Sequence, residues 1–416
     1  MDTLGLGDRT LLRLKDGAFG PHLWCIDTIV ERQLGSGYAV NTLLAQVRQL
    51  SALGAWLTEN GFTKLAEATP PIVQEFVRSQ PPRLNRGPVG VFMLPKLVAQ
   101  VRQLVGIPEP VLQETRLQPI TDGFKKYLQE ERGLAESTVR SYAEFAHKFL
   151  SSRFGLDPAE TPVLSELCHA DVIRHVISGA QTIGSRRVQF MVGALRVFLN
   201  YLFLRGDVKA NLASSVLTVA NWSLQTLPKA LEPEDTRLLL KHCNTRTAVG
   251  KRDFAVLLLL ARLGLRAGEV VGLTLDAIDW DAGEIILFGK SRRVDRLPMP
   301  RDVGEAIVAY LQSARPACSS RLVFVRARAP YVGLSSSCAI GDIVRRGLRR
   351  AGLTPARKGA HLLRHGLAQQ MLRRGANLTE IGQVLRHQWV NTTAIYAKVD
   401  LDALRPLTLS WPGGAR

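Results

Sequence analysis

Four short stretches towards the end of the chain contain residue types that could carry out chemistry on a phosphate. They are ARLGLRAGEV at 261–270, FGKSRRVDRLPMP at 288–300, HLLRH at 361–365 and LRHQWVNTTAIYAKV at 385–399. They supply arginines and a lysine to bind negative charge, histidines to move protons, and a tyrosine hydroxyl to act as a nucleophile. Each stretch alone is ordinary, since HLLRH fits a polar helix face, a lysine fits a turn and Tyr396 fits a protein core. Only their joint occurrence in this order is informative.

An arginine, a lysine, HxxR, a histidine and a tyrosine in this order resemble the motifs of the tyrosine recombinase, or phage integrase, family. The resemblance is strong over residues 227–416 and implies a catalytic integrase domain there. Residues 118–226 are similar, at the level of pattern, to the helical core-binding (SAM-like) domain of the family. Residues 1–117 match only loosely and resemble an added helical arm-like region.

The resemblance implies that Tyr396 is the nucleophile that cuts DNA and stays bound to it through a 3′-phosphotyrosyl bond. A phenolate is also a good leaving group, so the covalent intermediate stores the energy of the broken linkage and rejoining needs no ATP. Lys290, on a predicted hairpin turn, matches the general acid that protonates the 5′ oxygen. No metal and no cofactor are expected.

The remaining motif residues match groups that bind the phosphate. The resemblance implies that Arg266 and Arg364 clamp the scissile phosphate, more strongly as charge gathers in the transition state. His361 matches a phosphate contact or a proton-transfer partner, and His387 a hydrogen bond to a non-bridging oxygen. Glu269 is expected to hold Arg266 or His361 in place.

The sequence departs from the family pattern near two of these residues. Arg386 stands where the family commonly has glycine before His387, which costs backbone freedom and is expected to add a phosphate contact. Arg292 and Arg293 lie beside Lys290 and are expected to contact DNA. His365 is interpreted as a structural residue.

Charge supports a polyanionic partner. The chain has 416 residues, 46% of them hydrophobic, and a formal net charge of +18. Residues 227–416 hold 30 lysines and arginines against 16 acidic residues, which accounts for +14 of that charge. A nucleic acid is the usual partner of so basic a protein, although a merely basic solvated surface is the alternative.

Metal and disulfide chemistry are not supported. The five cysteines are scattered, with no CxxC pair and no cluster at ligand spacing. Asp276, Asp279 and Asp281 could together hold Mg²⁺, but an acidic connector before the hairpin is the preferred interpretation. The first residues lack the apolar region of a signal peptide, and a cytoplasmic, nucleoid-associated protein is expected.

Periodicity predicts a mainly α-helical fold with a small β-hairpin or three-stranded sheet. The second segment reads as a helical packing domain in which Ser185, Arg186 and Arg187, at the start of a helix, could face a phosphate, or could be ordinary surface residues. Ser137 is expected to cap a helix. The predicted helices cover 40–59, 71–79, 95–105, 120–132, 138–152, 185–205, 233–243 and 253–263, and the predicted strands cover 284–288 and 294–299.

These expectations converge on a site-specific recombinase that acts on specific double-stranded DNA sites as a homo- or hetero-tetramer, alone or with accessory recombinases. The extra N-terminal region favours an integrase or transposase of a mobile element. Two alternatives stay open, namely a catalytically silent DNA-binding protein of the same fold and a type IB topoisomerase-like relaxing enzyme. The tail at 400–416 is expected either to dock on a neighbouring protomer or to be a loose end.

Overall fold

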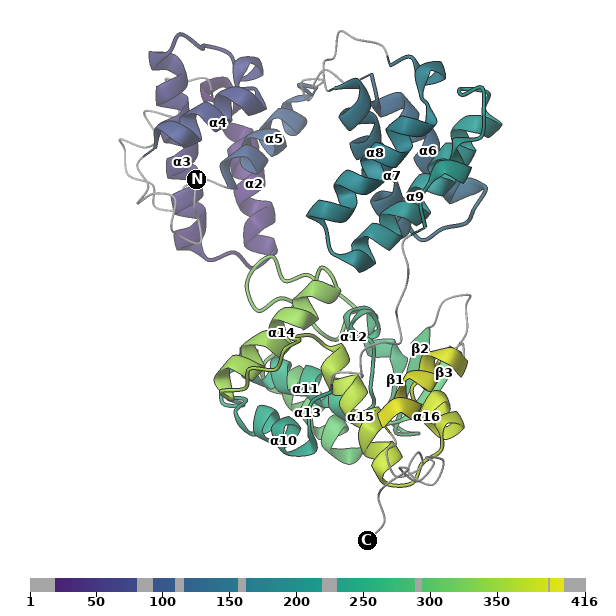
Figure 1. Ribbon diagram of the computed structural model, residues 1–416. Coiled ribbons are helices and arrows are strands. Elements are labelled where there is room, and N and C mark those ends of the chain that lie inside the picture. Colours follow the sequence, from purple (N-terminus) through teal and green to yellow (C-terminus); the bar gives the residue numbers. More distant parts are fainter. Residues whose placement is uncertain are drawn as a thin grey trace. The chain divides into compact units, whose positions relative to one another are not determined.

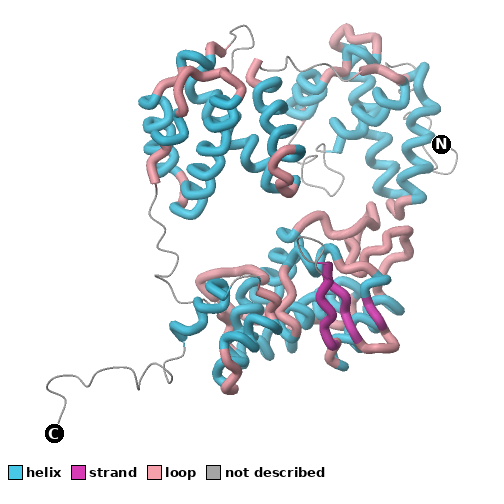
Figure 2. Tube along the Cα trace, turned by 90° about the vertical axis from the view of Figure 1, so that its right-hand side faces the viewer, coloured by secondary structure: helices cyan, strands magenta, loops and turns pink. Residues whose placement is uncertain are grey.

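The computed structural model describes residues 19–80, 93–108, 116–155, 162–218, 230–288, 294–387 and 390–399. It confirms a mainly helical chain with one small antiparallel sheet (Figures 1 and 2). Separate hydrophobic cores form within residues 19–101, 117–216 and 231–363. The chain divides into two compact units, one of them residues 108–223 and the other the remainder. The proposed domain limits at 117 and 226 stay predictions.

The N-terminal part is a bundle of helices around leucine and valine side chains. Its helices are α2 (Leu23–Gly35), α3 (Val40–Glu59), α4 (Pro70–Ser79) and α5 (Leu94–Val105), with the short 3-10 turns η2 (Gly20–His22) and η3 (Leu65–Glu67). Leu43, Val47 and Leu50 recur at helical spacing on α3 and are buried, which is why the sequence predicted this helix. Helix α2 was not predicted.

The second part packs α6 (Gln118–Glu130), α7 (Glu136–Phe154), α8 (His169–Thr182) and α9 (Ser185–Leu204), with η6 (Leu164–Glu166) and η7 (Leu212–Ser215). Phe124 and Phe198 meet edge to face in its core, 4.9 Å apart. By length and composition α9 could cross a membrane, but most of its apolar residues line this core. The predicted cap at Ser137 is wrong, because α7 begins at Glu136 with Ala135 at the N-cap.

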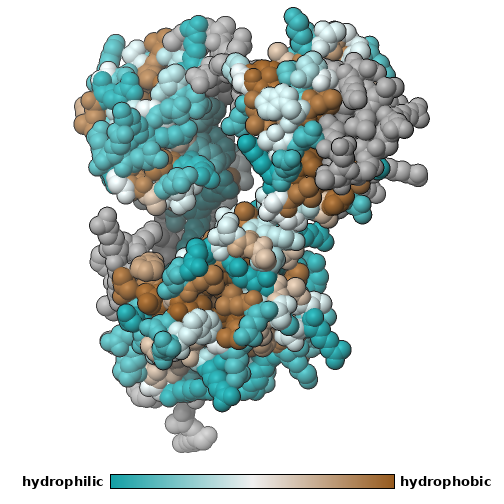
Figure 3. Space-filling model, turned by 180° about the vertical axis from the view of Figure 1, so that it is seen from behind, coloured by the Kyte–Doolittle hydropathy of each residue, from teal (hydrophilic) through white to brown (hydrophobic). Residues whose placement is uncertain are grey.

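The C-terminal part surrounds the apolar helix α11 (Ala248–Arg262) with other helices (Figure 1). These are α10 (Pro233–Lys241), α12 (Ala267–Gly272), α13 (Arg301–Ser313), α14 (Ser337–Arg350), α15 (His361–Arg373) and α16 (Leu378–Val384), with η8 (Leu275–Ala277), α17 (Val390–Thr393) and η10 (Ala394–Val399). The surface also carries apolar side chains, and Figure 3 shows patches of them in the lower part of that view.

The sheet consists of β1 (Ile278–Asp279), β2 (Glu284–Phe288) and β3 (Val294–Pro298) in that order (Figure 2). Strands β2 and β3 pair antiparallel, with Glu284 opposite Pro298 and Phe288 opposite Val294. This register confirms the predicted hairpin. Ile285 and Leu287 point into the core, which fixes the face that the sheet buries.

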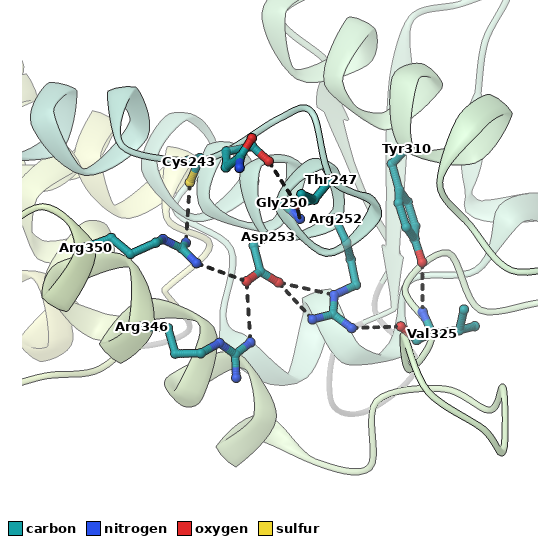
Figure 4. A network of polar contacts seen from close by, with 10 residues as sticks. Cys243, Thr247, Gly250, Arg252, Asp253, Tyr310, Val325, Arg346 and Arg350 are labelled. Atoms are coloured by element: carbon teal, nitrogen blue, oxygen red, sulfur yellow. Dashed lines mark hydrogen bonds and ion pairs between the residues drawn. The ribbon is translucent and has the colours of Figure 1, made fainter. Parts of the chain in front are cut away.

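A buried carboxylate ties α11 to α14 (Figure 4). Asp253 is fully buried and accepts hydrogen bonds from Arg252, with the shorter contact at 2.9 Å. Arg346 and Arg350 approach its other oxygen at 3.4 and 3.9 Å. Arg252 also donates to the carbonyl of Val325, at 3.2 Å, so the cluster anchors the loop after α13. Three guanidinium groups thus share one buried carboxylate, one of them buried with it and two reaching it from the surface.

Removal of this carboxylate should strongly destabilise the C-terminal part. We expect Asp253→Asn to lower the free energy of unfolding by about 3–5 kcal/mol, because Arg252 would stay buried without a counter-charge. Chemical denaturation measures the change. The matched control is Asp342→Asn, which breaks the exposed pair with Arg345 on α14 and should cost less than about 0.5 kcal/mol. Equal losses in the two variants would contradict this role for Asp253.

Candidate active site

Arg266 is held where α11 passes into α12. The chain turns at Gly264, whose φ of 58° is in the left-handed region that glycine adopts without strain. Arg266 is then the N-cap of α12, and its backbone N–H donates to Glu269 Oε2 at 2.8 Å. Arg266 Nη1 donates to the other carboxylate oxygen, Oε1, at 2.7 Å. Glu269 therefore has the contact with Arg266 that the sequence suggested.

Arg364 lies on α15 and is 5% exposed. Its Nη1 donates to the carbonyl of Gly264 and its Nη2 to the carbonyl of Leu385, so one guanidinium joins the turn before Arg266 to the end of α16. Burial, with the nearby charges of Arg266 and Arg386, lowers the pKa of Arg364 to about 10. The group is still a cation at neutral pH.

His387 is positioned by the C-terminus of α16. The N–H of Arg386 donates to the carbonyl of Gln383 at 3.0 Å, and the N–H of His387 to that of Gly382 at 2.9 Å, which is the Schellman arrangement. This arrangement requires a left-handed residue, and Arg386 has φ 54°. A side chain there costs on the order of 1–3 kcal/mol. His387 Nδ1 lies 2.7 Å from Thr393 Oγ1, which connects the turn to α17.

The Arg386 side chain points into the protein. It is 5% exposed, and its Nη2 donates to Glu269 Oε2 at 2.7 Å. Its backbone carbonyl accepts from Arg266 Nη2 at 3.0 Å. The sequence suggested a phosphate contact for Arg386, whereas in the structure its guanidinium binds a buried carboxylate.

Tyr396 is buried, 1% exposed, in a small cluster with Ala368, Ile381 and Leu385. Its hydroxyl lies 2.7 Å from His365 Nδ1. Burial raises the pKa of Tyr396 to about 12, although the charge of Arg364 acts in the opposite direction. The phenol is therefore neutral at physiological pH.

His365 is the imidazole that lies beside this hydroxyl. Burial, and next the neighbouring His361, lower its pKa to about 4, so the imidazole is neutral above that pH. The ring centres of His361 and His365 are 6.2 Å apart, and His361 is exposed in the first turn of α15. The sequence interpretation of His365 as structural missed its contact with Tyr396. The available signal was that His361 and His365, four residues apart in HLLRH, lie on one helix face.

The other predicted site residues are placed elsewhere or lie outside the described residues. Lys290, Arg292 and Arg293 fall in the undescribed residues 289–293. Ser185, Arg186 and Arg187 are exposed at the start of α9, in the other compact unit. Arg187 lies 3.8 Å from Glu144 and over the ring of Phe145.

The acidic connector has partners of its own. Asp276 pairs with Arg321, and Asp279 Oδ1 accepts from the N–H of Ala282 at 2.9 Å. Among the residues that the structure describes, no group of three or more histidines, cysteines or carboxylates could hold a metal ion.

The arrangement suits a reaction at a phosphate. Arg266 and Arg386 bind one carboxylate, Glu269, and Arg364 lies near enough for its charge to interact with all three groups, which leaves an excess of positive charge beside Tyr396 and His387. Backbone carbonyls and a carboxylate hold these cations before any substrate binds, and such preorganised charge stabilises a developing anion.

Two partly buried imidazoles, those of His365 and His387, should make the free protein sensitive to acid. Burial lowers the pKa of His387, like that of His365, to about 4, against about 6.5 in an unfolded chain. The unfolded state thus binds more protons between pH 6.5 and 4, and stability is lost as pH falls through that window. Each histidine adds a slope of up to about 1.4 kcal/mol per pH unit, reduced where water reaches the ring.

Urea unfolding of wild type and His365→Gln at several pH values between 7.5 and 4.5 measures this slope. We expect a shallower pH dependence in the variant, because one depressed imidazole has been removed. Identical slopes would mean that the pKa of His365 is not depressed in the folded protein.

Comparison with known proteins identifies the family. The model of the phage integrase family matches residues 229–402. A protein of Sinorhizobium fredii, described as "Putative integrase/recombinase y4rA", is 40% identical over 402 residues, which cover 95% of this chain and 96% of that protein. The tyrosine recombinase XerD of Listeria innocua is 29% identical over 294 residues, which cover 67% of this chain and 94% of XerD.

A solved structure shares the fold. The site-specific recombinase XerH, bound to its palindromic difH substrate in a post-cleavage complex, has a TM-score of 0.54 at 16% identity, over 80% of this chain and 92% of that one. The match to y4rA extends over nearly the whole sequence, and the family model covers the residues that form the site. The chain therefore belongs to the phage integrase family of tyrosine recombinases.

Proposed function

We propose that this protein is a site-specific DNA recombinase in which Tyr396 cuts one strand at a time and forms a 3′-phosphotyrosyl intermediate. The observation that carries the proposal is the pair of Tyr396 and His365, 2.7 Å apart, beside the buried cation Arg364. A neutral phenol, a neutral imidazole and a fixed cation are the groups that attack on a phosphodiester requires.

In the proposed cleavage step the Tyr396 oxygen bonds to phosphorus while the bond from phosphorus to the 5′ oxygen breaks. The phenolic proton passes to His365, and Lys290 gives a proton to the departing 5′ oxygen. Arg266 and Arg364 neutralise the non-bridging oxygens, with His361 and His387 as further contacts. Rejoining reverses these transfers, since a 5′ hydroxyl attacks the phosphotyrosine and no net bond energy is lost.

The burial of Tyr396 adds a requirement to this mechanism. A side chain that is 1% exposed cannot reach a phosphate without displacement of the segment that carries it or of the residues that cover it. The segment is short, because α17 and η10 together span residues 390–399. We infer that DNA binding selects an arrangement in which the hydroxyl is accessible.

The biological role that we propose is integration or transposition of a mobile element. The support is the N-terminal region, since y4rA matches 95% of this chain whereas XerD matches 67%. The partners would be specific double-stranded DNA sites, bound by a tetramer of this chain alone or with accessory recombinases. Such a protein would work in the cytoplasm at the nucleoid. Ser185, Arg186 and Arg187 would contribute phosphate contacts.

A nicked suicide substrate made from the DNA that flanks the gene tests the nucleophile. Without added metal, wild-type protein should form a covalent adduct that survives a denaturing gel. The short strand between the cut and the nick, which carries the 5′ hydroxyl, diffuses away, and rejoining therefore fails. Tyr396→Phe should form none, since only the attacking oxygen is removed. Tyr310→Phe is a matched control, because that buried tyrosine contacts Val325 and lies outside the site.

The outcomes separate the candidate functions. Adducts in Tyr396→Phe would mean that another residue is the nucleophile. Tight DNA binding by wild type with no adduct would favour a silent accessory protein. Relaxation of supercoiled DNA that lacks any flanking sequence would favour a topoisomerase.

A substrate with sulphur at the 5′ bridging position tests Lys290. A thiolate leaves without protonation, so the general acid becomes unnecessary. We expect Lys290→Ala to slow cleavage of normal DNA by about 10²–10⁴-fold, as loss of an acid does, and to cleave the sulphur substrate nearly as fast as wild type. Arg292→Ala and Arg293→Ala are the matched controls. If the sulphur substrate restored cleavage by Arg292→Ala or Arg293→Ala and not by Lys290→Ala, the general acid would be that arginine.

A further inference from the structure

Arg386 combines two features that are each unfavourable. Its backbone is left-handed, and it is the only non-glycine residue with positive φ among the residues described. Its cationic side chain is buried, and burial lowers the pKa of Arg386. Glycine would avoid both problems at once. A residue that keeps both is expected to serve a purpose that its side chain alone provides.

The contacts of Arg386 form a closed ring with Arg266 and Glu269. The Arg386 carbonyl accepts from Arg266 Nη2 at 3.0 Å, and its Nη2 donates to Glu269 Oε2 at 2.7 Å. Glu269 Oε1 accepts in turn from Arg266 Nη1 at 2.7 Å. Both terminal nitrogens of Arg266 are therefore fixed, one by the backbone of Arg386 and one by a carboxylate that Arg386 holds.

We propose that Arg386 is a positioning residue that acts on Arg266 through Glu269 and does not bind DNA. It holds the Arg266 side chain in place and offsets the negative charge of Glu269. The inference rests on the proposed recombinase function, in which Arg266 meets the scissile phosphate. It assigns the side chain at this position to the protein interior, where its partner is a carboxylate of α12.

The charge balance explains why a second cation would help. Glu269 is buried enough that its side chain is 14% exposed, whereas that of Arg266 is 43% exposed. If Glu269 had Arg266 as its only cation, its negative charge would cancel the charge that the phosphate must meet. Arg386 supplies an equal positive charge to the same carboxylate, so Arg266 keeps an uncompensated charge toward the exposed side.

The geometry also explains why Arg266 should depend on this support. Side chains that hold a reacting group in place act by position, and a displacement of about 1 Å can cost about 100-fold in rate. Without Arg386, the Glu269 carboxylate would keep its contacts with Arg266 but lose its ion pair with the residue at the end of α16. The two side chains could then move together. Binding of DNA through other residues would continue.

Single-turnover cleavage of the suicide substrate at saturating DNA tests the proposal with Arg386→Met, Arg386→Lys and Arg386→Gly. We expect Arg386→Met to slow cleavage about 10- to 100-fold, as loss of a supporting contact does, with DNA affinity within about twofold of wild type. Arg386→Lys should recover part of the rate, because it restores the charge. Arg386→Gly should fold at least as stably and still cleave slowly. The matched control is Arg373→Met, another arginine paired with a glutamate, Glu232, on the surface.

A methylphosphonate at the scissile position separates positioning of a phosphate ligand from general damage. This group lacks the charge that Arg266 would neutralise. On that substrate the cleavage rate of Arg386→Met should therefore approach the wild-type rate. A double-mutant cycle with Glu269→Gln should be strongly non-additive, since both residues act on one guanidinium. Both results together would establish the path from Arg386 through Glu269 to Arg266.

Other outcomes would overturn the role of Arg386. Weaker DNA binding by Arg386→Met with a smaller salt dependence would mean a direct phosphate contact. Equal losses on phosphate and methylphosphonate DNA would mean a purely structural role, and wild-type rates in Arg386→Gly would mean that only the backbone matters. Absence of an adduct from wild-type protein would instead overturn the proposed function.

Discussion

The buried guanidinium of Arg364 is the contact on which the rest of the site depends. It donates to the carbonyls of Gly264 and Leu385, which lie 100 and 21 residues away along the chain. Each carbonyl immediately precedes a segment that supplies a site residue. A single side chain on α15 thus sets the distance between the start of α12 and the end of α16, and it carries its own charge into the same place.

Burial of that charge constrains its neighbours. Three guanidinium groups repel one another, and the lowered pKa of Arg364, caused first by burial and then by Arg266 and Arg386, reflects that repulsion. The negative charge of Glu269 reduces this repulsion. Burial alone would raise the pKa of its carboxyl, but its hydrogen bonds and cationic partners outweigh burial and lower that pKa. The protein therefore holds an excess of positive charge that an anion such as a phosphate would neutralise. This is the state expected of a preorganised anion site.

Much of this could be predicted from local patterns. The α3 and α9 helices followed from apolar residues at helical spacing, and the β2–β3 hairpin from two short alternating runs around a turn. Helix α8 was missed because Cys168 is an unusual N-cap, completed by Asp171 three residues later. The direction of the Arg386 side chain could not be predicted, because arginines are seldom buried and its partner Glu269 is 117 residues away.

The motif also does not predict the exposure of Tyr396. Motif order places a tyrosine after a histidine, but it says nothing about exposure, and the structure buries that phenol against His365. Burial keeps the hydroxyl protonated and away from water, while the depressed pKa of His365 keeps the acceptor unprotonated. Both partners are therefore uncharged near neutral pH, and the phenol is covered by the side chains that surround it. In the proposed mechanism burial opposes both the ionisation of Tyr396 and its access to a phosphate, so the displacement that exposes the phenol removes both obstacles.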